Sequence, residues 1–153
     1  MSAEQKLKEL GLELPPAPAP AANYVPYTLE NGILFISGQV PLNAEGKLEF
    51  LGKIGKDMDQ EQGTASARLC ALNGLAQMRA ALGSLDRVKK VLRIGGFVNC
   101  TDDFTNQPEV INGASDLLVE VFGEKGRHAR AAVGTNALPR GVATEVEFVV
   151  AVE

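Results

Sequence analysis

The stretch Gly126–Phe148, GRHARAAVGTNALPRGVATEVEF, decides how the last two strands of the sheet are expected to pair. Two runs with strand-like patterns flank Leu138–Gly141, whose Pro and Gly are typical of a turn. The stretch therefore predicts a C-terminal β-hairpin, with basic side chains on its first strand and acidic side chains on its second.

Alternation of side chains divides the second strand into two faces. One face is predicted to lie in the core under helices, and it consists of Val142, Thr144, Val146, Phe148, Val150 and Val152. A turn at residues 138–141 sets Gly134 opposite Glu145 and Arg130 opposite Val149. Four side chains are then predicted to share the face away from the core: His128, Arg130, Glu145 and Glu147.

Two interpretations of this charged face stay open. In the first, Arg and Glu form an ordinary surface ion pair, which contributes little to stability. In the second, the small residues Ala129, Ala131, Ala132 and Gly134 leave a cavity around the arginine. A fixed guanidinium in a cavity is suited to a carboxylate or a phosphate, and a neighbouring glutamate can orient or activate water.

Composition and charge limit the other function classes. The chain has 153 residues, which is enough for one domain with a single core. A net charge of −4 and a pI near 5.1 argue against an extended nucleic-acid surface. Cys70 and Cys100 lack metal-ligand spacing, so buried reduced thiols and no metal site are expected. The sequence has neither a membrane-spanning run nor a signal-peptide layout, so we expect a cytoplasmic protein.

The rest of the chain predicts an α+β fold. A short amphipathic helix is expected at residues 3–11 and an extended Pro/Ala tether at 15–22. Strands at about 24–29 and 32–38 flank an Asn-Gly turn. Helical spacing extends over residues 58–82, with Gly83 as the C-cap. A further strand is expected at 87–100, where Gly95-Gly96 indicates a bulge or a close backbone approach.

A second helix begins near Pro108 and ends at Gly123, with its apolar residues on one stripe. Two long helices then cover one face of a mostly antiparallel sheet. No second domain is available to cover the other face, so we expect an oligomer.

Three motifs with matching spacing resemble the RidA (YjgF) family. They are SGQVP at Ser37–Pro41, the asparagine of VINGASDLL at Asn112, and R-x-x-V-x-x-x-x-LP-x-G-x-x-x-E-x-E over Arg130–Glu147. The resemblance extends over about residues 22–153. It divides the chain into an N-terminal extension, 1–22, and a RidA-like domain, 23–153.

The resemblance implies a chorismate-mutase-like fold, in a homotrimer whose sheets form an inner barrel with ligand clefts between subunits. It also implies deamination of small 2-imino or enamine acids to 2-oxo acids and ammonia, without a metal or an organic cofactor. The partner it implies is thus a small imino or oxo acid, with no membrane and no nucleic acid.

Site residues follow from the resemblance position by position. The carboxylate-binding arginine of the family corresponds to Arg130, and the acid that positions water corresponds to Glu145. A cleft tyrosine corresponds to Tyr24 and a second-helix asparagine to Asn112. The strand-end motif near the cleft corresponds to Ser37, Gly38 and Gln39.

Each residue of that set also has a structural interpretation. Tyr24 fits an ordinary strand aromatic, Ser37 a turn cap and Asn112 a helix-surface residue. Glu147 is expected to pair with Arg130 or with a neighbouring subunit. His128, the only histidine, lies outside the shared motif, and a rim or interface position is expected for it.

One departure from the family pattern concerns a cysteine that many members have two residues after the arginine. Here that position is Ala132, so thiol chemistry at that point of the cleft is not expected. Two other functions remain open: a non-catalytic regulator that binds small carboxylates, and an endoribonuclease or translation inhibitor. The acidic pI makes the endoribonuclease the weaker of the two.

Overall fold

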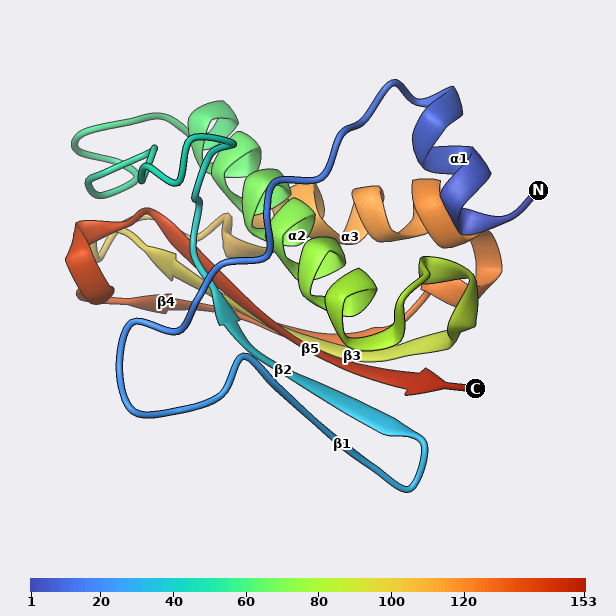
Figure 1. Cartoon of the computed structure of the whole chain (residues 1–153). Coiled ribbons are helices and arrows are strands. Elements are labelled where there is room, and N and C mark those ends of the chain that lie inside the picture. The colour runs from blue at the N-terminus through green and yellow to red at the C-terminus, as the bar shows by residue number, and fades with distance from the viewer.

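The computed structural model describes all 153 residues, and Figure 1 shows how its helices pack on a single sheet. Three short 3-10 turns, η1 (Leu85–Arg87), η2 (Gly123–Gly126) and η3 (Pro139–Gly141), join the larger elements. In chain order these are α1 (Ala3–Glu9), β1 (Tyr27–Glu30), β2 (Ile33–Gln39), α2 (Gln60–Leu82), β3 (Val88–Asn99), α3 (Gln107–Phe122), β4 (Ala129–Thr135) and β5 (Thr144–Val152).

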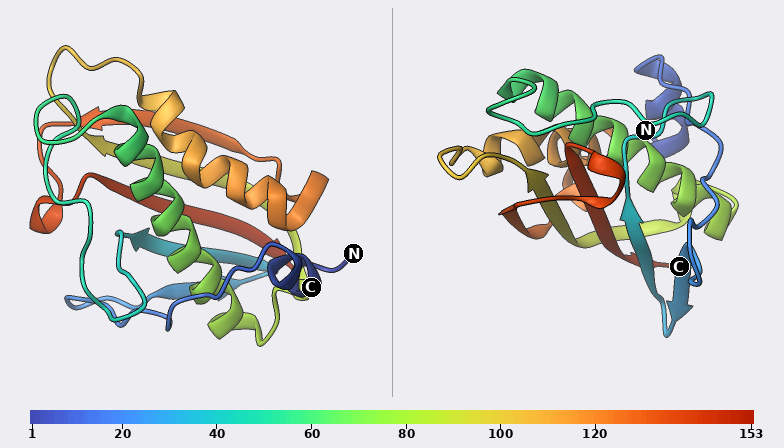
Figure 2. Two further views of the ribbon diagram at one scale, coloured as in Figure 1. Left: turned by 90° about the horizontal axis from the view of Figure 1, so that it is seen from above. Right: turned by 90° about the vertical axis from the view of Figure 1, so that its left-hand side faces the viewer.

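The five strands form one mixed sheet with the order β1-β2-β5-β3-β4. The pair β3–β4 is parallel, and the other neighbours are antiparallel. Helices α2 and α3 lie across one face of this sheet, as the view from above shows (Figure 2). The opposite face carries no helix, so the predicted layering of an α+β fold is confirmed.

The predicted C-terminal hairpin is wrong. Strands β4 and β5 are not paired, because β3 lies between them and pairs with both. The segment containing η3 is a connection that passes over the end of β3, and its turn residues look the same in sequence as those of a hairpin. The sheet is therefore mixed, and the predicted opposition of Gly134 to Glu145 does not occur.

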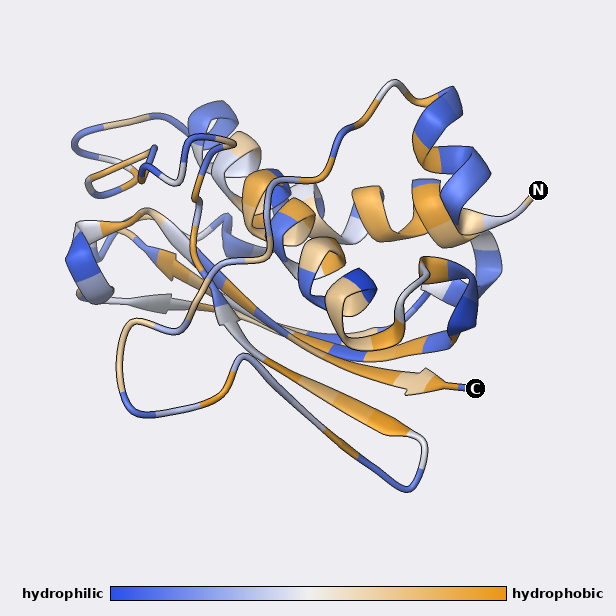
Figure 3. Cartoon of the chain, viewed as in Figure 1, coloured by the Kyte–Doolittle hydropathy of each residue, from blue (hydrophilic) through white to orange (hydrophobic).

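The faces predicted for β5 are confirmed. Its alternate residues from Thr144 to Val152 are buried, and the residues between them are half-buried on the other side. Phe148 is 1% exposed. Its ring packs so closely against Gly74 of α2 that any Cβ at position 74 would overlap it. The part of β2 before Ser37 and the part of β5 after Glu147 are hydrophobic (Figure 3), and these two parts pair with each other.

The two long helices begin and end where the sequence predicts. Asp59 caps α2 through a capping box with Gln62, and Gly83 ends it with φ +83°. Pro108 lies in the first turn of α3, and Gly123 follows its last residue. The helices approach closely at Gly113, where any Cβ would overlap the Thr64 carbonyl of α2.

The first hairpin is also confirmed, with shifted bounds. Asn31 and Gly32 both have positive φ, as a two-residue primed turn requires. Strand β1 begins at Tyr27, so Tyr24 lies before the strand in an irregular segment. In β3, the missing side chain of Gly96 allows Ile111 of α3 to approach the sheet closely, as one of the two interpretations of Gly95-Gly96 predicted. The other interpretation, a bulge at these residues, is wrong because the strand register is regular at both.

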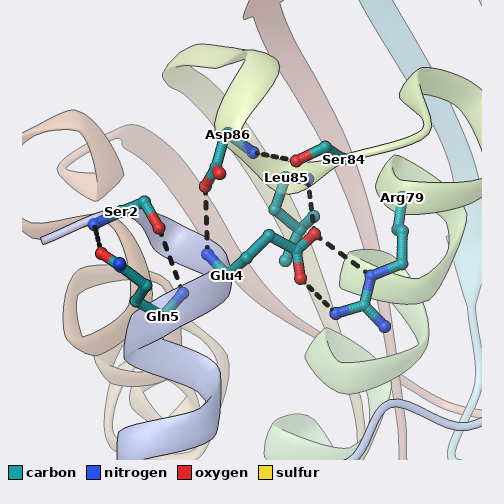
Figure 4. A network of polar contacts seen from close by, with 7 residues as sticks. All are labelled: Ser2, Glu4, Gln5, Arg79, Ser84, Leu85 and Asp86. Carbon is teal, nitrogen blue, oxygen red and sulfur yellow. Dashed lines mark hydrogen bonds and ion pairs between the residues drawn. The ribbon is translucent and has the colours of Figure 1, made fainter.

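The N-terminal helix α1 is fastened to the domain by Glu4 (Figure 4). The Glu4 carboxylate accepts hydrogen bonds from Arg79 Nε (3.2 Å), Arg79 Nη2 (2.5 Å) and the Leu85 backbone N–H (2.8 Å). Leu7 is 2% exposed within the main core. The following tether has no regular structure, and its Pro18 carbonyl accepts a hydrogen bond from Gln77.

Both cysteines are buried and free, as predicted. Burial raises the pKa of the Cys70 thiol to about 12, which is typical of an inert structural thiol. No helix combines the length and the apolar character that crossing a membrane requires.

Candidate functional site

Arg130 lies on the edge strand β4, on the face that carries the helices. Its register partner in β3 is Ile94, a fully buried core residue. The guanidinium extends over α3, where Nη1 donates to Ser115 Oγ (3.0 Å) and Nη2 donates to the Pro108 carbonyl (3.1 Å). Two acceptors on one helix therefore fix its orientation and leave other N–H groups available to a ligand.

A hollow of about 240 Å³ lies between α3 and the start of β4 beside this guanidinium. It is lined by Ser115, Asp116, Val119, Arg127, His128 and Arg130. His128 is half-buried, with Nε2 2.9 Å from Ser115 Oγ and Nδ1 2.6 Å from the Gly126 carbonyl. Burial lowers the pKa of His128, and the charges of Arg130 and Lys90 lower it further against the opposing effect of the Gly126 hydrogen bond.

Asn112 lies on α3, between the two residues of that helix that contact Arg130. Residues Pro108, Asn112 and Ser115 follow one stripe of α3, at the i, i+4 and i+7 spacing of a helical face. Because the first and last of these contact Arg130, Asn112 lies on the side of α3 that faces the guanidinium. Arg130 and Asn112, which the family resemblance selected, therefore lie on the same side of the molecule, and their joint role stays a prediction.

Glu145 lies on the opposite face of the sheet. Its register partner in β3 is Phe97, one residue out of phase with the core residue Ile94. The half-buried carboxylate of Glu145 lies against Gly38 of β2, so closely that a Cβ on Gly38 would overlap it. Burial raises the pKa of Glu145 above its usual range, and the charge of Glu147 raises it further.

Tyr24, Ser37 and Gly38 lie on the Glu145 side of the molecule. Ser37 Oγ donates to the Val25 carbonyl (2.8 Å), which fastens the segment containing Tyr24 to β2. Tyr24 and Ser37 line a hollow of about 390 Å³ together with Glu147 and apolar residues of β2 and β5. Tyr24 and Gly38 also line a smaller hollow of about 80 Å³. Tyr24 itself is 47% exposed.

The predicted site residues thus form two groups within one chain. Arg130 and Asn112 lie at the α3–β4 edge, and Tyr24, Ser37, Gly38 and Glu145 lie on the open face of the sheet. The sequence-based placement of Arg130 and Glu145 on one face is wrong, because Arg130 pairs in parallel with β3 and not across a hairpin with β5.

Two further expectations about the neighbourhood are corrected. No alanine lines the hollow beside Arg130, whose walls come from α3 and from Arg127, His128 and Arg130. Glu147 forms its ion pair with Arg93 of the same chain (3.4 Å), so the expected pairing with Arg130 does not occur. Position 132 is alanine and has no thiol. The thiol of Cys100 lies beside Gly134 on the helix-bearing side of β4, and both residues line a hollow of about 330 Å³.

Ser115 is the functional candidate that sequence reasoning missed. It follows Asn112 by one helical turn and Pro108 by two, so helical spacing alone could have placed it beside Arg130. Chemically, the two groups offer a fixed cation for an anionic ligand and a half-buried carboxylate with a raised pKa. No three His, Cys, Asp or Glu side chains lie close enough together to hold a metal ion.

An α+β domain with two helices on one face of a five-stranded mixed sheet, and with a fixed arginine on its edge strand, defines the class of this protein. Residues 4–149 match the family model described as "YjgF/chorismate_mutase-like, putative endoribonuclease". The match covers most of the chain, and the chain belongs to the RidA (YjgF) family.

Individual proteins are similar to this chain over most of its length. Protein TCP17 of Trypanosoma cruzi is 50% identical over 145 residues, which cover 94% of this chain and 90% of TCP17. The structure of Atu1372 from Agrobacterium tumefaciens is 44% identical with a TM-score of 0.91, covering 99% of this chain and 94% of that one. RidA from the Antarctic bacterium Psychrobacter sp. PAMC 21119 is 26% identical with a TM-score of 0.64, covering 89% and 94% of the two chains.

Proposed function

We propose that this protein is a deaminase that hydrolyses small 2-imino acids, or their enamine tautomers, to 2-oxo acids and ammonia. The observation that carries the proposal is the fixed Arg130 guanidinium beside an open hollow of about 240 Å³. A carboxylate is the only permanently charged group of a small imino acid, and a guanidinium held in one orientation binds it through two parallel hydrogen bonds.

Glu145 supplies the second part of the proposed chemistry. Its raised pKa brings the carboxylate closer to the working range of a general base near neutral pH. Glu145 takes a proton from water as the water oxygen adds to the imine carbon, and the C=N electron pair moves to nitrogen, which receives that proton from Glu145. In the resulting carbinolamine Glu145 passes the hydroxyl proton to nitrogen, the C–N bond breaks, a C=O bond forms, and ammonia leaves.

Such a site requires two copies of the chain, because Arg130 and Glu145 lie on opposite faces of one sheet. The open face supports association: Phe35 is 49% exposed and Val133 is 44% exposed, and both lie on the side without helices. We therefore propose an assembly in which Arg130 and Asn112 of one chain face Tyr24, Ser37, Gly38 and Glu145 of another. A homotrimer with three such sites is the form that the family resemblance favours, with residues 23–153 as its repeating domain.

The direct test generates 2-iminobutanoate with a dehydratase and traps it with semicarbazide. The protein is expected to suppress the adduct, and Arg130→Ala to abolish the suppression. Arg130→Lys keeps the charge but loses the two-pronged contact, so it should retain only part of the activity. Arg68→Ala is the matched control, because Arg68 is a half-buried arginine that pairs with Glu120 between the helices, away from Arg130.

A second function, a non-catalytic regulator that binds small carboxylates, uses the same Arg130. Thermal stabilisation by 2-oxobutanoate without any loss of the semicarbazide adduct would favour the regulator over the deaminase. Suppression that persists in Arg130→Ala would contradict both. The endoribonuclease function in the family's description would require salt-sensitive RNA cleavage by the purified protein, and the net charge of −4 gives it no support.

A further inference from the structure

Four groups beside the candidate site form a continuous chain of hydrogen bonds. Arg130 Nη1 donates to Ser115 Oγ (3.0 Å), Ser115 Oγ is 2.9 Å from His128 Nε2, and His128 Nδ1 is 2.6 Å from the Gly126 carbonyl. A carbonyl oxygen only accepts, so Nδ1 of His128 must carry a hydrogen. In the neutral imidazole Nε2 is then an acceptor, and the Ser115 hydroxyl donates to it.

Protonation of His128 reverses one bond of this chain. Nε2 then donates to Ser115 Oγ, which accepts from His128 and Arg130 together. The Ser115 hydroxyl hydrogen no longer has His128 as its acceptor and becomes available to a ligand bound at the neighbouring guanidinium. A carboxylate at Arg130 would accept that hydrogen, so it would gain one hydrogen bond and one nearby positive charge.

The charges around His128 make this protonation dependent on a bound anion. Burial opposes a positive charge on the imidazole, and Arg130 of β4 and Lys90 of β3 oppose it further, so its pKa is lowered despite the hydrogen bond to Gly126. Arg127 and Asp116 also line the hollow, and Glu124 of η2 pairs with Arg127 (3.0 Å). A carboxylate bound at Arg130 would offset the cations and would therefore favour the imidazolium.

We propose that carboxylate binding at Arg130 is coupled to uptake of a proton by His128, transmitted through the Ser115 hydroxyl. The inference rests on the proposed function only in taking Arg130 as a carboxylate site, and it does not require turnover. By linkage, the affinity for a carboxylate rises as pH falls through the titration of His128, by at most about tenfold per pH unit.

The sequence makes this coupling directly measurable, because His128 is the only histidine of the chain. Its ring proton signal in the NMR spectrum of the untagged protein can be titrated with and without 2-oxobutanoate. We expect the pKa of His128 to be higher in the complex. Butanone, which has the same carbon skeleton without the carboxylate, should leave it unchanged.

Two variants identify the route of the coupling. In Ser115→Ala the ligand-induced shift should fall by half or more, because only the through-space effect of the carboxylate remains. In His128→Gln a side-chain amide oxygen still accepts from Ser115 but cannot titrate. That variant should bind 2-oxobutanoate with an affinity that stays constant between pH 5.5 and pH 7.5, whereas the affinity of the wild type rises toward pH 5.5.

Each remaining outcome has one meaning. Binding of 2-oxobutanoate with an unchanged or lowered pKa of His128 overturns the coupling and leaves the proposed function standing. A full shift in Ser115→Ala overturns the role of the hydroxyl. An equal pH dependence in His128→Gln and wild type assigns the proton to another group and also overturns the inference. No binding at any pH shows that Arg130 is not a carboxylate site, which overturns the inference together with the proposed function.

Discussion

The Glu145 carboxylate lies against Gly38, and a Cβ at position 38 would overlap its Oε2 and Cδ atoms. The contact arises where the register between β2 and β5 shifts, between Ile36 and Gln39. Such an irregularity in a sheet re-aims nearby side chains. The SGQ motif at Ser37–Gln39, which the family resemblance selected, therefore packs against the proposed base Glu145.

We predict that Gly38→Ala displaces Glu145 without unfolding the protein, because the carboxylate is the far end of a flexible side chain. Imine hydrolysis should fall roughly 100-fold, the order of loss that a misplacement of about 1 Å produces. The semicarbazide assay measures the rate, and circular dichroism checks the fold. Gly95→Ala is a matched control, since the nearest atoms to its Cβ belong to Glu147 (2.9 Å) and Arg93 (3.1 Å) and not to Glu145. A similar loss in both variants would count against the specific role of Gly38.

Glu147→Gln should change the pH dependence of turnover. An ionised Glu145 is required, so kcat is expected to fall as pH drops through the raised pKa of Glu145, at higher pH than for an ordinary glutamate. Removing the neighbouring negative charge lowers that pKa, although burial continues to raise it. The acid limb of the kcat profile should therefore move to lower pH. Glu120 is exposed on α3, so Glu120→Gln should leave the kcat profile unchanged. If the acid limb of the profile does not move in Glu147→Gln, the charge of Glu147 does not act on the proposed base Glu145.

The hydrogen bonds of Glu4 with Arg79 and Leu85 should stabilise the fold at neutral pH. Although burial raises the pKa of Glu4, the hydrogen bonds from Arg79 and Leu85 outweigh it, so the folded-state pKa lies below the ordinary value of 4.5. Glu4→Gln should therefore lower the free energy of unfolding at pH 7 by roughly 1 kcal/mol, a figure reduced for partial solvent exposure.

That loss should disappear in acid. The stabilisation is fully present above about pH 4.5 and is lost as pH falls through the lowered pKa of Glu4 in the folded state. Urea unfolding at pH 7 and at pH 3 measures both limits. Glu9→Gln, which removes an exposed pair with Lys6, should change stability little at either pH. A constant difference between wild type and Glu4→Gln at both pH values would exclude the carboxylate as its source.

Local sequence patterns predicted the elements well, because caps and periodicity are local properties. Gly83 and Gly123 end the helices where expected, and the alternation on β5 correctly separated Phe148 from Glu145. The partner of a strand is not a local property. A turn at Leu138–Gly141 suits a hairpin and a crossover equally. The connection is a crossover because the twelve-residue strand β3 lies between β4 and β5 and pairs with both.

The candidate site shows the same division. The family motif identified Arg130 and Glu145, whereas the inference that they share a face depended on the wrong strand partner. Ser115 lies within the quoted stretch VINGASDLL, but the resemblance assigned no role to it, and only its contacts with Arg130 and His128 make it a candidate. Motifs thus selected the candidate residues, while the sheet order decided which of them lie together in a single chain.

The central claim is that Arg130 of one chain and Glu145 of another form each site, and mixing two inactive variants tests it most directly. Arg130→Ala retains Glu145, and Glu145→Gln retains Arg130, so mixed oligomers contain some sites with both native residues. After unfolding and joint refolding at equal amounts, roughly a quarter of wild-type imine hydrolysis should return, as random assembly of two chain types dictates. No recovery in oligomers verified to contain both variants would contradict a site shared between chains.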